Sequence, residues 1–365
     1  MGFTCGIVGL PNVGKSTLFN ALTAAQAQVA NYPFSTIDPN VGIIPVPDSR
    51  LNRLTEIYKP GKTVPTTLEF LDIAGLVRGA SKGEGLGNQF LAQIRNVDAV
   101  VHIIRCFDDP DIAHVDGSIN PRRDIEAVET ELILKDLETV DRRLSESEKR
   151  VKTGERKAKE EADFYVHARE HLLAGRLARY LAVHTEEQQA WLRDLHLLTN
   201  KPVLYVCNVH EKHLATETDY VSQVREVAAK ESTKVVVISA AVEAEVSELP
   251  EGERAAFLLE LGLKESGLNQ IIREGYDLLH LITFFSVNPN EAHAWTVRKG
   301  TTALKAAGVI HSDFERGFIR AEIIKYPDLA RLGSEAAVKE RGFLHVQGRD
   351  YVIQDGDVMF VRFNV

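Results

Sequence analysis

Cysteine is scarce in this chain, and the patterns of secreted and membrane proteins are missing. Only three of the 365 residues are cysteine, Cys5, Cys106 and Cys207, and none forms a CxxC pair. Zinc needs ligands clustered at fixed spacing, so we expect three buried thiols in strands instead of a metal site. Because no disulfide framework is implied, a reducing cytoplasm is the expected compartment.

Long apolar runs and an excess of basic charge are missing too. No run approaches the roughly 18 residues that a membrane span needs, and the first residues lack a signal-peptide pattern. The net charge of −9 argues against a surface coated by nucleic acid, so we expect neither a membrane nor a DNA partner. The length indicates two or three globular domains.

Short apolar runs alternate with helical patterns through most of the first 280 residues. Such runs lie at 3–8, 41–46, 68–73, 99–106, 203–207 and 234–238. This alternation predicts an α/β domain with a largely parallel sheet.

Between residues 124 and 198 the alternation stops. Apolar residues recur at steps of three and four after Ile125, which predicts an amphipathic helix packed against a second one as an antiparallel hairpin, with Thr153-Gly154 at its tip. Residues 142–159 contain eight Lys/Arg and three Asp/Glu. This basic tip is either a solvated helix surface or a contact for nucleic acid.

After residue 280 the pattern predicts short strands around a helix, in a compact α+β module. We expect 351–354 and 358–363 to pair as a hairpin across a turn that contains Gly356.

The strongest motif is Gly9-Leu-Pro-Asn-Val-Gly14-Lys15-Ser16, which matches G-x-x-x-x-G-K-[ST] between a predicted strand and a predicted helix. Its glycines let backbone N–H groups turn toward phosphate oxygens at the helix N-terminus. Lys15 would reach the β- and γ-phosphates, and the Ser16 hydroxyl would ligate Mg²⁺. The motif predicts binding of a nucleoside triphosphate.

Two more segments complete the expected phosphate site. Asp72 ends a predicted strand and would hold Mg²⁺ through water, while Gly75 would offer its N–H to the γ-phosphate. The polar loop at 31–40 would close over the phosphates, with Thr36 or Ser35 as a second Mg²⁺ ligand. We expect this loop and the glycine-rich stretch after Gly75 to be switch segments.

The base-binding loop and the catalytic position both differ from the Ras pattern. Asn208-Val209-His-Glu211 carries Glu where Asp would pair with guanine, and one extra methylene displaces the carboxylate, so the sequence favours ATP. Asn208 and neighbouring backbone groups would then contact adenine. Leu76 stands where a glutamine orients the attacking water, so we expect slow intrinsic hydrolysis.

Over nearly its whole length the chain resembles the YchF family, the Obg-like ATPases of the translation-factor class of P-loop NTPases. The resemblance rests on the P-loop, Asn-Tyr-Pro-Phe-x-Thr-Ile-Asp-Pro-Asn, Asp-Ile-Ala-Gly-Leu-Val, Arg105-Cys-Phe-Asp-Asp, the Asn-x-x-Glu loop and a C-terminal segment similar to the TGS module, a β-grasp unit. It implies a nucleotide-binding domain at 1–123 and 199–280, an inserted helical arm at 124–198 and a TGS module at 281–365.

The resemblance also implies roles for single residues and for partners. It assigns Mg²⁺ binding to Ser16 and Thr36, and contact with adenine to Asn208 and Val209. It assigns phosphate binding to the P-loop residues Asn12, Val13, Gly14, Lys15, Ser16 and Thr17. It makes His114 the stand-in for the missing glutamine and Asn12 a ligand for K⁺. It also implies association with the ribosome, where the arm and the TGS module would meet rRNA and ribosomal proteins.

Three functional hypotheses follow. The first is an ATPase that acts as a nucleotide-dependent switch on the ribosome. The second is an Obg-type GTPase in ribosome assembly, which differs at the base-binding loop alone. The third is a ribosome-binding module with incidental turnover, which Leu76 keeps open.

Overall fold

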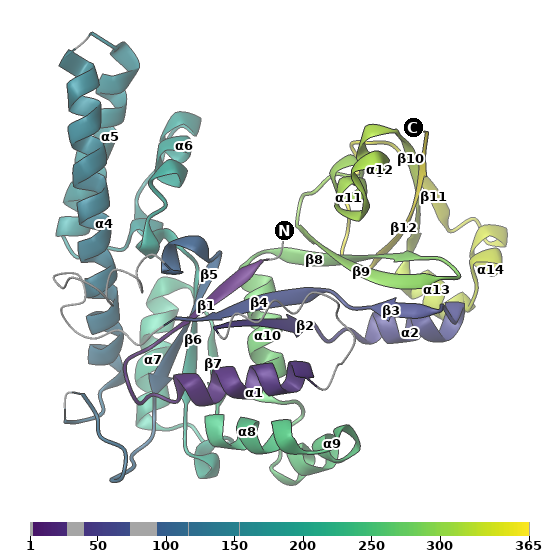
Figure 1. Cartoon of the computed structure of the whole chain (residues 1–365), viewed down its shortest axis with the longest axis horizontal. Helices are drawn as coiled ribbons and strands as arrows, with labels where there is room; N and C mark the ends of the chain where they lie inside the picture. Colours follow the sequence, from purple (N-terminus) through teal and green to yellow (C-terminus); the bar gives the residue numbers. More distant parts are fainter. Residues whose placement is uncertain (1–2, 28–39, 74–92, 116, 153, 365) are drawn as a thin grey trace. The chain divides into compact units, whose positions relative to one another are not determined.

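The computed structural model describes residues 3–27, 40–73, 93–115, 117–152 and 154–364 (Figure 1). Their contacts divide into two units, the first with 3–42 and 69–271 and the second with 43–68 and 272–365. The chain leaves the first unit within β2 (Val41–Pro45) and returns to it within β4 (Thr67–Asp72). Among the described helices, none is long and apolar enough for a membrane crossing.

The first unit is built on a six-stranded sheet in the order β2-β4-β1-β5-β6-β7, and its β4–β1, β1–β5, β5–β6 and β6–β7 pairs are parallel. The other strands are β1 (Thr4–Val8), β5 (Ala99–Arg105), β6 (Val203–Asn208) and β7 (Val235–Ile238). All of β5 is buried, as expected for an inner strand of a parallel sheet covered by helices. The predicted α/β fold is confirmed, and all three cysteines are buried free thiols.

Helices around this sheet supply the rest of the core. They are α1 (Lys15–Ala27), α7 (Asp219–Glu231), α8 (Ala240–Glu248), α9 (Glu251–Glu260), the start of α10 (Gly267–Leu278) and the short η3 (Glu211–His213). Helix α1 packs against β1 and α8, while α7 packs against β6 and β7. Because parallel strands end at the same edge, the turns after β1, β4, β5, β6 and β7 gather there.

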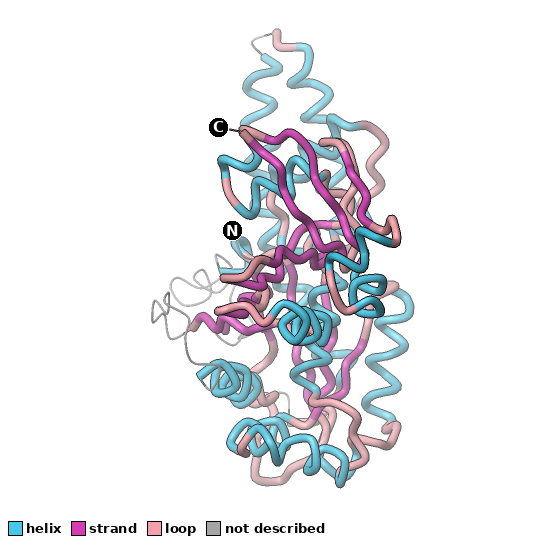
Figure 2. Tube along the Cα trace, turned by 90° about the vertical axis from the view of Figure 1, so that its right-hand side faces the viewer, coloured by secondary structure: helices cyan, strands magenta, loops and turns pink. Residues whose placement is uncertain are grey.

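The predicted helical hairpin is present as the arm, made of α4 (Pro121–Lys152) and α5 (Arg156–Leu173). The two helices run side by side (Figures 1 and 2), and the 32 residues of α4 extend over roughly 48 Å. Gly154 has φ +85° near the tip, and Thr153 lies outside the described residues. The base of the arm adds η1 (Ala178–Tyr180), α6 (Glu186–Leu195) and η2 (Leu198–Asn200).

The second unit holds another six-stranded sheet, in the order β11-β10-β12-β8-β9-β3. Its strands are β3 (Lys62–Val64), β8 (Leu281–Val287), β9 (Glu291–Arg298), β10 (Phe318–Lys325), β11 (Leu344–Gln347) and β12 (Asp357–Phe363). Its helices are α2 (Ser49–Tyr58), α11 (Ala303–Ile310), α12 (Ser312–Arg316), α13 (Tyr326–Leu332) and α14 (Glu335–Glu340), with the rest of α10.

This division differs from the expected boundaries. Segment 43–68, which we expected in the nucleotide-binding domain, belongs to the second unit, because β3 pairs with β9 and because Leu51 and Leu54 of α2 join Phe285 in one apolar core. The contacts also keep the arm with the nucleotide-binding sheet instead of setting it apart.

The expected C-terminal hairpin is wrong. Val352 forms only an isolated bridge with Thr302, whereas β12 pairs with β10 and β8. The carboxylate of Asp357 accepts the N–H of Gln354 at 2.9 Å, and this turn sends the chain into β12 without folding back on 351–354.

Candidate nucleotide-binding site

The predicted phosphate loop lies between β1 and α1. Asn12 and Gly14 have φ of +63° and +92°, a left-handed backbone that glycine adopts freely and asparagine tolerates. A Cβ on Gly9 would meet the carbonyl oxygen of Ile103 at 2.8 Å, so the loop passes β5 where only glycine fits. Since α1 begins at Lys15, its unpaired N–H groups face the position expected for phosphates.

Asn208, at the end of β6, braces this loop. Its side-chain amide donates to the carbonyl of Val13 at 2.9 Å, and its amide oxygen accepts the N–H of Ala240 at 2.9 Å. Asn208 is 4% exposed, and a Cβ on Gly14 would lie 2.3 Å from its amide nitrogen. These bonds use one of the two amide hydrogens, and Asn208 also lines the cavity described below, so the expected contact of this side chain with adenine stays a prediction.

Lys15 and Asp72, both expected at the phosphate site, are in direct contact. The Lys15 ammonium forms an ion pair with the Asp72 carboxylate, and both side chains are largely buried. Ser16 lies exposed in the first turn of α1. Thr36 and Gly75, the other residues expected around the γ-phosphate and Mg²⁺, lie outside the described residues, as does Leu76.

A cavity of about 560 Å³ opens beside the loop. The P-loop contributes Asn12, Gly14 and Thr17 to its wall, the turn after β6 contributes residues 208–211, and the turn after β7 contributes residues 239–241. The remaining wall consists of Phe107, Asp109 and Ile112. Val209 and Glu211, which the sequence predicts to meet the base, are thus among the residues that line this cavity.

The sequence identified neither the 239–241 turn nor the 107–112 wall. Each of them follows a predicted strand, and the carboxyl ends of parallel strands are the usual place for a ligand, so strand position was the available signal.

Buried Arg105 shapes the 107–112 wall. Its guanidinium donates to the carbonyls of Phe107 at 3.1 Å, Ile112 at 3.0 Å and Asp109 at 3.2 Å, and it lies 4.7 Å from the Phe107 ring centroid. One side chain thus fixes three carbonyls of this loop. From the sequence, Arg105 is recognisable only as part of a family motif.

His114 is not an isolated loop side chain. Its Nε2 lies 3.1 Å from Oδ2 of Asp124 at the start of α4, and the two side chains are only 6% and 4% exposed. The preceding residue is tied to the P-loop, because the amide of Asn12 donates to the carbonyl of Ala113 at 3.0 Å. The segment that carries His114 therefore links the P-loop to the arm.

The donor set fits Mg²⁺, a hard cation that prefers oxygen. Asp72 supplies a carboxylate beside the first turn of α1, where Ser16 supplies a hydroxyl. Among the described residues there is no group of three or more His, Cys, Asp or Glu that could hold a metal by itself, so phosphate oxygens would complete the coordination. For K⁺, the Asn12 amide oxygen is the candidate ligand.

Comparisons with known proteins match both halves of the chain. A family model described as 50S ribosome-binding GTPase matches residues 4–138, and one named YchF-GTPase_C, described as a protein of unknown function, matches 281–364.

Full-length similarities are strong. The chain is 52% identical to the ribosome-binding ATPase YchF of Bacillus subtilis over 367 aligned residues and 52% identical to that of Escherichia coli O157:H7 over 365, in both cases across all of each chain. Among solved structures, the YchF GTPase of Schizosaccharomyces pombe superposes with a TM-score of 0.89 at 37% identity, covering 99% of this chain and 98% of that one.

Proposed function

The chain belongs to the YchF family, and from this premise we propose that it is a ribosome-associated ATPase whose nucleotide state acts as a switch in translation or its regulation. The observation that carries the proposal is the cavity beside the P-loop, which joins a phosphate-binding turn to the base-binding loop at Glu211. The relatives' name, ribosome-binding ATPase, supports both the chemistry and the partner. The cytoplasm, where ribosomes work, is the expected location.

Phosphate binding would begin with an exchange of partners. The Lys15 ammonium would leave the Asp72 carboxylate for the β- and γ-phosphate oxygens, which carry more charge. Ser16, Asp72 and Thr36 would hold Mg²⁺, which supplies neutralisation of the charge on the phosphate oxygens. The separation of Lys15 from Asp72 is the first local change that ATP would cause.

Base selection would depend on Val209, Glu211 and the 239–241 turn. Asn208 would contribute as well, because it lines the cavity and fixes the P-loop relative to the turn after β7. Glutamate at position 211 is one methylene longer than the aspartate that pairs with guanine, so the guanine contact is lost while adenine can use backbone donors and acceptors.

In the hydrolytic step a water oxygen attacks the γ-phosphorus, the bond from that phosphorus to the β–γ bridging oxygen breaks, and the electron pair leaves with ADP. The water's proton passes to phosphate or solvent. His114 would orient the water in place of the glutamine replaced by Leu76, and Asp124 would hold the imidazole. With no glutamine, the intrinsic rate is expected to be slow. The side-chain amide oxygen of Asn12 would bind K⁺, so the rate of hydrolysis would depend on K⁺.

Ribosome binding would use the basic arm tip and the C-terminal module. Lys152, Lys157 and Lys159 are exposed beside Gly154, where rRNA phosphates could reach them. Changing Lys152, Arg156, Lys157 and Lys159 to Gln should weaken co-sedimentation with ribosomes and flatten its salt dependence. A matched variant carries four changes to Gln in the first unit and away from the arm tip, at Arg225, Lys230, Lys234 and Lys264. Equal binding by both variants would exclude the arm tip as the contact.

A GTPase is the second candidate, because the description of the matching N-terminal family and the name of the Schizosaccharomyces pombe structure both say GTPase. Displacement of a fluorescent nucleotide by ATP and by GTP in Mg²⁺ separates the two. We expect ATP to displace at least about tenfold better, which is about 1.4 kcal/mol. Glu211→Asp should reduce the ratio of ATP affinity to GTP affinity. Glu217→Asp, the same change outside the cavity, should leave this ratio unchanged. Stronger displacement by GTP would refute the ATPase assignment.

A further inference from the structure

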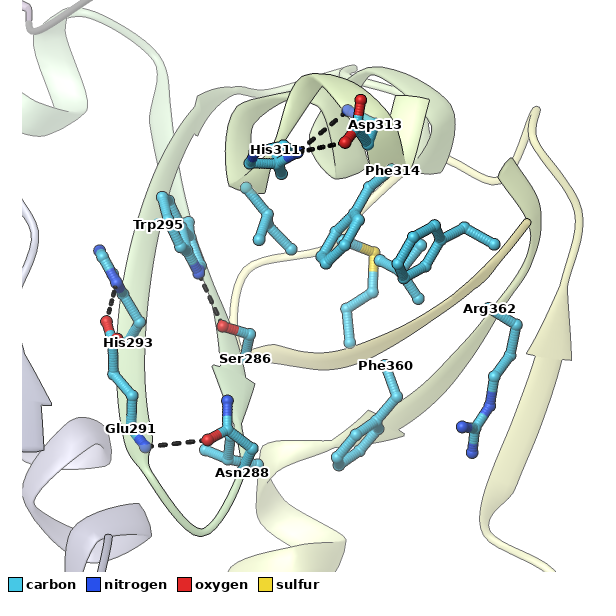
Figure 3. Close-up of a pocket in the computed structure, with 15 residues that line it drawn as sticks. Ser286, Asn288, Glu291, His293, Trp295, His311, Asp313, Phe314, Phe360 and Arg362 are labelled. Carbon is cyan, nitrogen blue, oxygen red and sulfur yellow. Dashed lines mark hydrogen bonds and ion pairs between the residues drawn. The ribbon is translucent and has the colours of Figure 1, made fainter. Parts of the chain in front are cut away.

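The second unit contains a cavity that the nucleotide chemistry does not use. Its volume is about 730 Å³, larger than the cavity beside the P-loop (Figure 3). All the residues that line it are described, and they come from β8, β9, α11, α12, β12 and adjoining turns.

The cavity lies where two strands of the sheet separate. Strands β8 and β12 are parallel neighbours, but they pair at the single register position Phe285–Val358. Both strands continue past this position, β8 to Val287 and β12 to Phe363, and these continuations line the cavity. On its other side β12 is paired with β10 along its whole length.

Both faces of β12 border the same cavity. Met359, Val361 and Phe363 share one face of the strand, while Phe360 and Arg362 share the other, and all five are lining residues. Residues from both faces of one strand can line the same cavity only where the cavity runs along the edge of that strand. In an antiparallel pair every second residue directs its N–H and C=O away from its partner, so the β12 groups not used by β10 face this cleft.

The wall opposite β12 is held rigidly. The Trp295 indole N–H donates to Ser286 Oγ at 2.8 Å, and the His293 ring stacks on the indole with centroids 3.6 Å apart and an angle of 10° (Figure 3). Glu291 accepts a hydrogen bond from His293 Nδ1 at 2.5 Å. Burial lowers the pKa of His293, so this wall carries a neutral imidazole. A site whose side chains are already fixed loses little entropy on binding.

Charge argues against a nucleic-acid occupant. Arg362 is the one lysine or arginine among the lining residues, and Glu322 binds its guanidinium through two hydrogen bonds, of 3.1 and 2.8 Å. Asp313 and Glu291 add carboxylates to the rim. Phosphate would therefore meet no uncompensated lysine or arginine here, whereas main-chain groups and apolar side chains match an extended polypeptide.

We propose that the cleft between β8 and β12 binds an extended segment of a partner protein, which adds as a strand along the edge of β12 that no described strand pairs beyond Val358. Five residues from Met359 to Phe363 provide about 17 Å of edge. Alternate side chains of the segment would pack on Phe314, whose ring lies 4.3 Å from that of Phe363. This site is independent of the nucleotide proposal.

The test uses the full chain and a displayed library of random heptapeptides, followed by fluorescence anisotropy with a synthetic peptide of the selected sequence. Phe363→Glu places a charge at the cleft, since Phe363 is a lining residue that is 43% exposed. Ile319→Glu is the matched control, because Ile319 is 60% exposed on the neighbouring strand and is not a lining residue. Labelled random octanucleotide RNA is the competing probe, and amide hydrogen exchange locates the contact.

We expect selected peptides with alternating apolar residues, at least tenfold weaker binding by Phe363→Glu, unchanged binding by Ile319→Glu, and slower exchange at amides within 359–363. Failure to enrich any sequence would overturn the proposal. So would peptides that bind Phe363→Glu as well as they bind the unaltered chain. Binding of RNA that Phe363→Glu abolishes, without peptide binding, would assign the cleft to RNA and refute the proposal.

Discussion

Replacement of Asn208 by Ala should weaken the binding of every triphosphate by a similar factor. The change removes two buried hydrogen bonds, to the carbonyl of Val13 and from the N–H of Ala240. Each bond contributes about 1 kcal/mol net, and a buried group left without a partner costs about 1–3 kcal/mol, so we expect a loss of about 2–4 kcal/mol in unfolding free energy. If about 2 kcal/mol of this is needed to hold the P-loop, nucleotide affinity falls about 30-fold.

The assay compares displacement of a labelled nucleotide by ATP and by inorganic tripolyphosphate, which has no base. If Asn208 acts by holding the phosphate loop, the substitution should lower the affinities for ATP and for tripolyphosphate by the same factor. A base-contacting Asn208 predicts a loss for ATP and none for tripolyphosphate. Asn52→Ala, an exposed asparagine on α2, is the control for the substitution itself. Tripolyphosphate binding that is unchanged in Asn208→Ala would refute the brace.

Three other changes follow from the same contacts. Gly14→Ala should reduce ATP affinity at least about tenfold in a titration, because the new Cβ meets the bracing amide at 2.3 Å and φ is +92°. Asp124→Ala should lower kcat about tenfold with nucleotide affinity retained, because it releases the imidazole of His114, and an unchanged kcat would contradict a role of the held imidazole in the reaction. Burial and the nearby Glu231 carboxylate raise the pKa of Glu129 to about 7, above its unfolded value, so the folded state binds more protons between about pH 4.5 and 7 and stability falls as pH rises through that window. Between pH 5 and pH 8 the unfolding free energy of the unaltered chain should therefore fall by about 2–3 kcal/mol relative to that of Glu129→Gln, and parallel pH curves of the two proteins in urea unfolding would contradict this.

Local patterns predicted the parts of the molecule that depend on neighbours in sequence. The P-loop could be found because its spacing, its strand and its helix lie within 25 residues. The arm could be found because Ile125, Val128 and Leu132 repeat at helical spacing, and all three are buried. In both cases the residues that decide the structure are close together in the chain.

Long-range pairing explains what the sequence did not predict. Asn208 braces Val13 across 195 positions, and no spacing rule connects an amide to a carbonyl at that separation. The assignment of segment 43–68 depends on β3 pairing with β9, more than 200 residues away. The hairpin expected at 351–363 failed because alternation alone does not choose between neighbouring strands as partners, and β12 pairs with β10 and β8.

The discontinuity of the second unit sets an order of events during synthesis. Leu51 and Leu54 leave the ribosome early, but Phe285, against which they pack, is translated more than 200 residues later. At a translation rate of about 5–20 residues per second, at least about ten seconds pass between the synthesis of these leucines and that of the residue they pack against. A nascent chain that ends before β8 therefore exposes an apolar helix face, which makes a truncated product vulnerable to aggregation and a client for chaperones.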